Sequence, residues 1–429
     1  MSRLFFSLCA ICYVSILCGQ ETVRSLPYYI EAALNNSPLI QDYRNQKEIQ
    51  QDELLRLKAL YTRSKVELNG DYLFVPIISK DNGKTAFRWN APDGIDYYGY
   101  DLGQSSGHLQ TGLTWTQPLL GNQSYKVAKR QTVIDMDIMD NHIHLERHQL
   151  ERTVTEQYIQ CLQDRKLMEY ADSIEQLLAQ QRSIVKRLVD NGLAKQSDLP
   201  LLSIEQDANH DLKATSLQSY RTHLIDLNIL CGIRDTAFVS LEKADISPHP
   251  AFNEASCFLE QYRLDSLNTI TSFHSFNLQY KPQLNLFIDG GLRTGQYQAV
   301  QKHLGISAGL TFSWILFDGR QRRQKERQAR TQLNSIGIYK TNFQLQNELR
   351  KQQYLLELST YGKRDALLQN QITGYTQVLS DYRKEIQAGQ LSVIDYITVL
   401  RNKIQAEKDR MLLQTNQQLL IAAYNYWNW

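Results

Sequence analysis

His144 and His148 are four positions apart in a predicted helix, a spacing that could hold a metal ion. Four positions apart on a helix, two imidazole rings lie on one face and can share a transition metal. No acidic residue completes a recognised ligand pattern around them. We therefore expect a solvated histidine pair and no metal.

A second candidate for chemistry is the glycine-containing stretch DGGLRTGQ at 289–296. It resembles a phosphate-binding loop only in its glycines, because it lies between two predicted strands rather than before a helix. We interpret it as a surface hairpin loop. No serine or cysteine nucleophile can be matched with a histidine and an acid, so the sequence predicts neither an enzyme nor a cofactor.

Composition points to long helices and away from nucleic acid. The 429 residues include only 21 glycines and 9 prolines, and 21% are charged with a net charge of +2. This balance favours long helices over many short elements. The one basic block, Arg320 to Arg330, is interpreted as a solvated helix face, so we expect no nucleic-acid partner.

The first nineteen residues have the pattern of a secretory signal. Arg3 precedes an apolar run, Leu4–Leu17, that is too short to span a bilayer comfortably. We expect a signal peptide over 1–19 with cleavage before Gln20; the alternative is that Cys18 carries a lipid. No later segment offers eighteen uninterrupted apolar residues, so a membrane role would be surface-bound or of the β-barrel kind.

Three cysteines remain after the signal: Cys161, Cys231 and Cys257. An odd number without metal-ligand spacing indicates neither a disulfide framework nor a zinc site.

Helical periodicity covers most of the mature chain. A helical opening at 27–63 is interrupted near Ser37, which can cap a new helix that begins with Pro38. The remaining predicted helices are 121 to about 190, its return to about 230 after a turn at Asn191-Gly192, 257–279, 319–387, and a last helix to Trp429 after a turn at Gly389. Helices this long suggest coiled-coil packing.

Four segments alternate like β-strands, with an apolar row on one face and a small or polar row on the other. They lie at 66–74, 108–116, 282–290 and 307–318, and the last is predicted to join its helix without a loop. The apolar rows include Leu68, Leu113, Leu286 and Leu310. Between the first two strands, residues 79–107 are expected to form a long loop rich in Gly, Asp and Tyr.

The chain is an internal duplication. Leu113 and Leu310 are 197 positions apart (310 − 113 = 197), and Asp198 and Asp395 keep the same offset far downstream (395 − 198 = 197). The domains predicted from this repeat are 20–231 for the first structural repeat, 232–256 for a linker with two prolines, and 257–429 for the second repeat.

The backbone N–H and C=O groups at the edges of the predicted sheet need hydrogen-bond partners. On alternation alone they fit half-buried strands of a soluble sandwich as well as membrane strands. In lipid, four strands cannot close a barrel and open edges are forbidden, so several chains would have to share one. Two copies would nearly fill the interior with side chains, so a pore argues for three copies and twelve strands.

Several of these segments resemble one known family. The junctions PLLGN and ILFDG, the stretch SLPYYIEAALNNSPLI, and the turns NGLAKQSDL and AGQLSVIDY together are similar to the TolC family of outer membrane efflux channels, over essentially all the mature chain. The resemblance implies a mainly α fold of long antiparallel hairpins, an α-barrel, with four strands that contribute to a trimeric twelve-stranded β-barrel. It also implies a place in the outer membrane of a Gram-negative bacterium, with the helices in the periplasm.

The resemblance further implies partners and site residues. The partners are a periplasmic adaptor (membrane fusion protein) and an inner-membrane RND or ABC transporter, and the strand-to-helix junctions fall on Pro118, Gly121, Asp318 and Gly319. The adaptor-docking tips fall on Asn191, Gly192 and Leu193 and on Ala388, Gly389 and Gln390.

A periplasmic gate is implied at Asp395, with Asp198 as its repeat counterpart, although both also suit a helix N-terminus. The family's second acidic position is Thr398 here and its frequent arginine is Leu391, which puts a gate closed by an Arg and Asp network in doubt.

Three functions are therefore compared: an efflux conduit, a periplasmic coiled-coil adaptor or structural protein, and a secreted enzyme. An adaptor should have one long hairpin flanked by small β domains, whereas this chain has two hairpins with strands between their halves. An enzyme should have a pocket constellation. The sequence favours the conduit and does not identify the transported substrate.

Overall fold

The computed structural model describes residues 23–74, 77–81, 83–88, 96–98, 107–250, 256–294, 302–388, 390 and 392–429. The chain divides into two compact units, each built from both repeats. The first contains residues 1–41, 144–257 and 343–429, and the second contains 42–143 and 258–342. Three helices continue from one unit into the other: α2 (Pro38–Thr62), α3 (Gly121–Asp190) and α6 (Gln321–Gln387).

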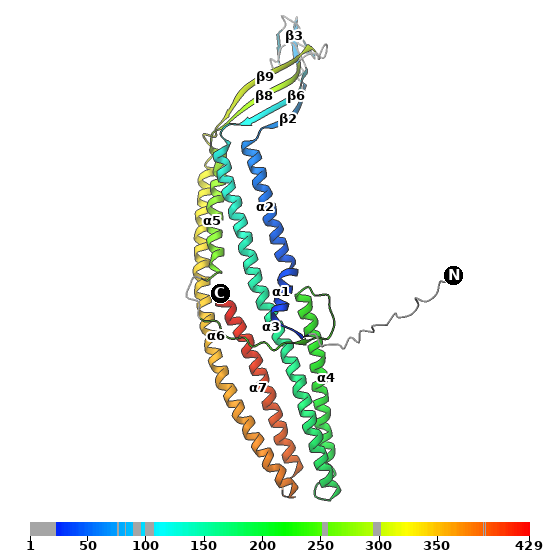
Figure 1. Ribbon diagram of the computed structural model, residues 1–429. Helices are drawn as coiled ribbons and strands as arrows, with labels where there is room; N and C mark the ends of the chain where they lie inside the picture. The colour runs from blue at the N-terminus through cyan, green and yellow to red at the C-terminus, as the bar shows by residue number, and fades with distance from the viewer. Residues whose placement is uncertain are drawn as a thin grey trace, which may run out of the picture. The chain divides into compact units, whose positions relative to one another are not determined.

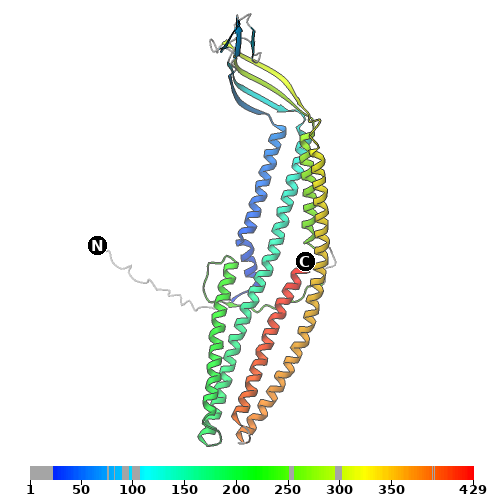
Figure 2. The same ribbon diagram turned by 180° about the vertical axis from the view of Figure 1, so that it is seen from behind.

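The first unit is built on two helical hairpins. The lower part of α3 packs with α4 (Asp198–Leu230), and the lower part of α6 packs with α7 (Val393–Trp427) (Figures 1 and 2). All four helices contribute to one apolar cluster, which includes Leu178, Leu202, Leu379 and Leu400. The predicted long helices and the turn at Asn191-Gly192 are confirmed, and α3 ends at Asp190, where the sequence predicts an end at about 190.

A second apolar cluster in this unit brings in the N-terminal segment and the inter-repeat linker. It joins Tyr29 of α1 (Leu26–Asn36) to Tyr158 of α3 and Tyr220 of α4. Strand β1 (Val23–Arg24) pairs in parallel with β7 (Ser240–Leu241). The Tyr158 hydroxyl lies 2.6 Å from Glu242 O and 3.1 Å from Arg24 O, so its single proton is shared between carbonyls on both sides of this pairing. The described part of the linker is therefore held by backbone and side-chain hydrogen bonds across the hairpins.

The predicted break in the first helix is confirmed. Between α1 and α2, Ser37 Oγ accepts a hydrogen bond from Ile40 N at 3.3 Å, and Pro38 is the first residue of α2. This is the arrangement in which proline loses no hydrogen bond, because the first helical N–H groups have no partner inside the helix.

The second unit contains a four-stranded antiparallel sheet in the order β2-β6-β8-β9. Its strands are β2 (Lys65–Phe74), β6 (Gly107–Pro118), β8 (Gln283–Thr294) and β9 (Leu304–Ser313). The same unit contains α5 (Leu259–Phe276), which ends in a 3-10 turn, η1 (Asn277–Tyr280). The four predicted strands are confirmed, and β6 and β9 begin 197 positions apart (304 − 107 = 197).

Two expectations about loops are wrong. The expected loop at 79–107 contains strand segments: β3 (Ile77–Asp81), β4 (Lys84–Arg88) and β5 (Asp96–Tyr98) form a separate sheet in the order β4-β3-β5. The expected hairpin loop at 289–296 is also strand as far as Thr294, because Asp289 to Leu292 continue the pairing of β8 with β9. Residues 295–296 lie outside the described residues.

The last strand is shorter than predicted and does not run directly into its helix. β9 ends at Ser313, opposite Gln283, the first residue of β8. Pro282, just before it, has no N–H to donate, and the preceding residues form η1, so the chain beyond Ser313 finds no partner strand. Residues 314–320 form a connection, and α6 begins at Gln321.

Candidate functional site

One face of the four-stranded sheet is apolar across all four strands. Register places Leu68 of β2 opposite Leu113 of β6, and Leu286 of β8 opposite Leu310 of β9. Since residues directly opposite share a face, the apolar rows of the strands form one surface. Much of it is exposed: Leu68 retains 75% of its accessible surface and Leu310 retains 61%.

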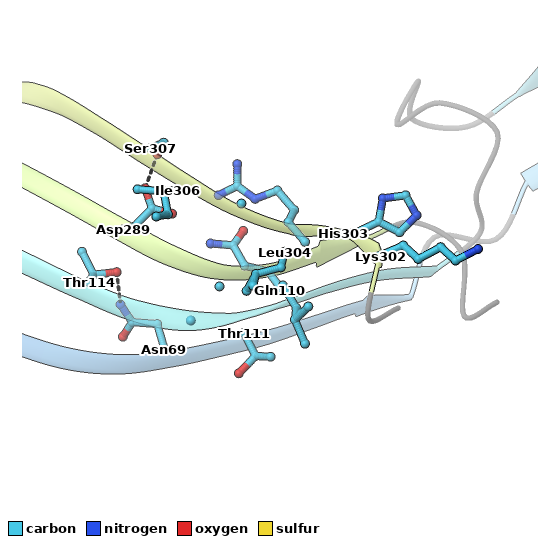
Figure 3. Close-up of a pocket in the computed structure, with 15 residues that line it drawn as sticks. Asn69, Gln110, Thr111, Thr114, Asp289, Lys302, His303, Leu304, Ile306 and Ser307 are labelled. Carbon is cyan, nitrogen blue, oxygen red and sulfur yellow. Dashed lines mark hydrogen bonds between the residues drawn. The ribbon is translucent and has the colours of Figure 1, made fainter. Parts of the chain in front are cut away.

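The opposite face is polar and hollowed. Asn69 Nδ2 donates to Thr114 Oγ1 at 3.2 Å, and Ser307 Oγ donates to the Asp289 carboxylate on the neighbouring strands (Figure 3). These residues, with Gln110 and others, line a depression of about 400 Å³. The sheet thus has two chemically different faces, as the alternation predicts.

The sheet is open at both edges. Each inner strand has two partners, whereas β2 pairs only with β6 and β9 only with β8 among the described residues. Each edge strand is ten residues long and so presents a row of backbone groups that can accept another strand.

The first strand-to-helix junction is tight. Pro118 ends β6, and Leu119 N donates to Leu284 O at 2.9 Å. Gly121 starts α3 with the carbonyl of Tyr61 directly against its Cα, so a Cβ there would overlap that carbonyl. The close approach explains why this junction residue is glycine.

The second strand-to-helix junction is a turn held by the Asp318 carboxylate. The Asp318 carboxylate accepts from Arg320 N at 2.9 Å and Arg322 N at 2.7 Å, while Gly319 and Arg320 both have positive φ, 66° and 70°. The hydrogen bond from Arg322 N, and that from the Tyr280 side chain, lower the pKa of Asp318. Asp318 is therefore an anionic cap at the start of α6.

Each of the two helical tips contains the same type of backbone hydrogen bond. Leu193 N donates to Leu188 O at 2.8 Å, and Gln390 N donates to Glu385 O at 2.9 Å. At the first tip, Asn191 precedes Gly192, which has φ of 75°; this left-handed residue and the bond over five residues define a Schellman C-cap.

At the second tip, Ala388 N donates to Lys384 O at 3.1 Å. Gly389 and Leu391 lie outside the described residues.

The two candidate gate carboxylates occupy different environments. Asp198, the first residue of α4, is buried and accepts from Lys195 N at 3.1 Å, so it closes the turn before its helix. Asp395 is in the first turn of α7 and exposed. Thr398, one turn later, is also exposed and donates to Ile394 O at 2.8 Å. The carboxylate free to face an aqueous space is therefore Asp395.

Two links between the hairpins were not predicted. Arg401 Nε of α7 donates to Glu205 Oε1 of α4 at 2.9 Å, and Tyr170 Oη of α3 donates to Glu407 Oε2 of α7 at 2.8 Å. Burial, followed by the nearby Glu407 charge, raises the pKa of Tyr170. Neither pair has a local sequence signal, because the partners are 196 positions apart in the first pair and 237 in the second.

The two histidines of the candidate pair have different surroundings, because the His144 side chain is exposed whereas the His148 ring is stacked on aromatic rings. His148 stacks on both Tyr426 and Trp429, with ring centroids 4.7 and 4.1 Å away, while His142, not His144, stacks on Tyr43. In the part of the chain that the structure describes, no group of three or more His, Cys, Asp or Glu is placed to hold a metal.

A search of the described helices finds none that is both long enough and apolar enough to span a membrane. The described cysteines are all free thiols, with Cys161 and Cys231 buried and Cys257 exposed.

No protein-family model matches the sequence, and no curated protein matches it. Solved structures do match the fold. The outer membrane protein VceC from Vibrio cholerae has 13% identity and a TM-score of 0.68, over 94% of this chain and 96% of that one.

Two further matches are CusC, in a study of its folding and transmembrane channel formation, and MtrE, an outer membrane channel from Neisseria gonorrhoeae. CusC has 12% identity and a TM-score of 0.69, over 95% of this chain and 92% of that one. MtrE has 12% identity and a TM-score of 0.67, over 94% and 88%. The chain therefore has the fold of the TolC-family outer membrane channels, and the chains it matches are described as channels and membrane proteins rather than enzymes.

Proposed function

We propose that this protein is an outer membrane channel: a passive conduit, built from three copies, through which a tripartite efflux or export system moves its cargo from the periplasm to the exterior. The observation that carries the proposal is the exposed apolar face of the sheet, combined with two unpaired edges. A protein in water exposes few apolar patches of this extent, whereas a membrane strand needs them.

Edge pairing supports the copy number. If β9 of one copy pairs with β2 of the next, three copies close a barrel of twelve strands without an open edge. The apolar faces then contact lipid and the polar faces, with Asn69, Thr114 and Asp289, line the interior. The matched structures support this arrangement through their fold.

The helical tips are the proposed docking surface. Asn191, Gly192 and Leu193, with Ala388, Gly389 and Gln390, are assigned to contact a periplasmic adaptor that couples the channel to an inner-membrane RND or ABC pump. The Leu193 side chain is 57% exposed, and the Leu193 N–H already donates to Leu188 O within the turn. The side chain is therefore available to a partner. Asp395 is assigned to the periplasmic entrance.

The alternative is a periplasmic coiled-coil adaptor or structural protein of an export system. It would leave the apolar face of the sheet without an apolar environment, which favours the channel. Planar lipid bilayers distinguish the two: purified protein should add stepwise, long-lived conductances. Protein that gives no conductance, and binds a channel instead, would support the adaptor.

A further inference from the structure

The start of α6 carries a dense set of cations just beyond the end of the sheet. Six basic side chains lie within residues 320–330, with Glu326 as the single acid, and all six are exposed: Arg320, Arg322, Arg323, Lys325, Arg327 and Arg330. Only Arg330 among them has an ion pair in the part of the chain that the structure describes, with Glu326. A solvated helix face explains their exposure but not their clustering at this point of the fold.

Two of these cations are fixed against aromatic rings. The Arg322 guanidinium lies 6.0 Å from the centroid of the Tyr280 ring, and Lys325 Nζ lies 5.9 Å from that of Phe276. The two rings contact each other edge to face at 5.7 Å. Cations held over aromatic faces are positioned without being neutralised, which leaves their charge for a ligand.

The aromatic group continues the apolar face of the sheet. Trp314 follows Phe312 in the alternation, and its Nε1 donates to Tyr280 O at 3.2 Å. The connection after it, Ile315 to Phe317, is strongly exposed, with Leu316 at 79% and Phe317 at 84%. Along this side of the second unit, the apolar face of the sheet is thus followed by Trp314 and Tyr280, and these are followed by Arg322 and Lys325.

That order matches the layers of a bilayer surface. Hydrocarbon contacts apolar side chains, Trp and Tyr favour the interface, and basic residues bind the phosphates of anionic headgroups. We propose that Arg322 and Lys325, together with Trp314 and Tyr280, form a binding site for anionic phospholipid headgroups at the rim of the sheet, where β8 begins and β9 ends. The site rests on the proposed membrane insertion of the sheet.

A second copy of the chain is the competing occupant. Helix α2 has acids at Asp52 and Glu53, but Glu53 is paired with Arg56 on its own helix. The charged residues between Arg56 and the sheet, Lys58 and Arg63, are both basic. At the start of β2, the acid Glu67 is already paired with Lys65 of its own strand. Charge complementarity near the rim therefore favours lipid phosphate over a neighbouring copy.

The test uses full-length protein in phosphatidylcholine vesicles doped with brominated lipid, which quenches nearby tryptophan. Quenching by brominated phosphatidylglycerol is compared with quenching by brominated phosphatidylcholine. The Trp115→Phe and Trp314→Phe variants separate Trp115, on the apolar face of β6, from Trp314 at the rim. We expect both lipids to quench Trp115 equally and phosphatidylglycerol to quench Trp314 preferentially.

Neutralising the cations should remove the preference. Each of Arg322→Gln and Lys325→Gln should lower it about fivefold, whereas the charge-preserving Arg322→Lys/Lys325→Arg variant should retain it. Lys340→Gln/Lys363→Gln, two exposed lysines farther along α6, is the matched control and should have no effect.

Equal quenching of Trp314 by the two lipids, with Trp115 still quenched, would overturn the lipid site alone. An Arg322→Gln/Lys325→Gln double variant that keeps the lipid preference would also overturn the lipid site, and so would one that loses its oligomeric state instead of the preference. Absence of quenching at Trp115 would overturn the membrane function on which the site rests.

Discussion

Leu193 and Gln390 occupy the same position in two copies of one turn. They are 197 positions apart, and each donates its backbone N–H to the carbonyl five residues earlier, at 2.8 and 2.9 Å. The internal duplication is therefore preserved down to a single hydrogen bond at the ends of α3 and α6. Around that bond the sequences differ, so each tip can offer a partner a different surface.

The first tip gives a matched pair of glycine substitutions. Gly192→Ala places a Cβ on a residue with φ of 75° and should cost about 1 to 2 kcal/mol at the turn. Gly374→Ala, at an open position inside α6, should be neutral or stabilising by up to about 1 kcal/mol. We expect only Gly192→Ala to raise hydrogen exchange at the tip and weaken crosslinking to the adaptor. Equal crosslinking by both variants would argue against docking at this turn.

The two faces of β9 should differ in their tolerance of charge. Leu310→Arg, on the exposed apolar face, should cost about 2 to 4 kcal/mol and reduce membrane assembly, whereas Thr311→Arg should assemble normally. The measurement is the yield of folded oligomer in the membrane fraction. Normal yield for Leu310→Arg with failure of Thr311→Arg would mean that the faces are inverted.

Gly112 lies in the polar row of β6, where a substitution could be chosen as a second control for Leu310→Arg. It is unsuitable because the position has no room for a side chain. A Cβ at this position would lie 2.8 Å from Gly290 O and 3.0 Å from Gly291 Cα. Gly112→Ala should therefore reduce assembly for steric reasons even though it adds no charge. Assembly equal to that of the unmodified protein would show that the β6–β8 contact can relax.

The exposed carboxylate at the entrance should affect ion selectivity. If three copies of Asp395 face the axis, Asp395→Asn should lower the preference of the reconstituted pore for cations, measured as the reversal potential under a salt gradient. Asp409→Asn, another carboxylate of α7, is the control. An unchanged reversal potential would leave Asp395 as a helix N-terminal residue that complements the helix dipole.

The stacked histidine predicts a pH-dependent C-terminal segment. Burial lowers the pKa of His148, so the folded state favours the neutral ring. The unfolded segment then binds protons more readily, and stability should decrease as the pH falls below about 6.5. After division by the intrinsic exchange rate at each pH, hydrogen exchange of residues 420–429 should increase as the pH is lowered from 7.5 to 5.5. His148→Phe, which keeps a stacked ring without a titrating group, should abolish that dependence; a dependence that persists would assign it to another group.

The sequence predicts the elements well where a local signal exists. Asn191 and Gly192 mark the end of α3 because a C-cap needs a left-handed residue, and alternation identifies both faces of the sheet. The end of β9 was missed because Trp314 to Phe317 remain apolar, and only the position of Pro282 on the partner strand decides where pairing stops. Strands β3 to β5 were missed because their segment is rich in turn residues.

Candidate site residues follow the same division. Asp318 and Gly121 could be placed at junctions from their neighbours in sequence, and Asp318 caps a helix as its residue type suggests. The Arg401–Glu205 and Tyr170–Glu407 links depend on packing between hairpins, which no periodicity within one hairpin specifies. The proposed lipid site at Tyr280, Trp314, Arg322 and Lys325 could not be predicted from the sequence either, because the turn at Asp318 is what brings Arg322 close to Tyr280.

We propose above that the sheet inserts in the outer membrane as part of a three-copy channel. The most direct test of this proposal is to separate inner and outer membranes of cells that produce the full-length protein, and to measure the mass of the detergent-extracted species. We expect the protein in the outer membrane fraction, as a particle of three copies. A monodisperse, detergent-free monomer in the periplasmic fraction would contradict it.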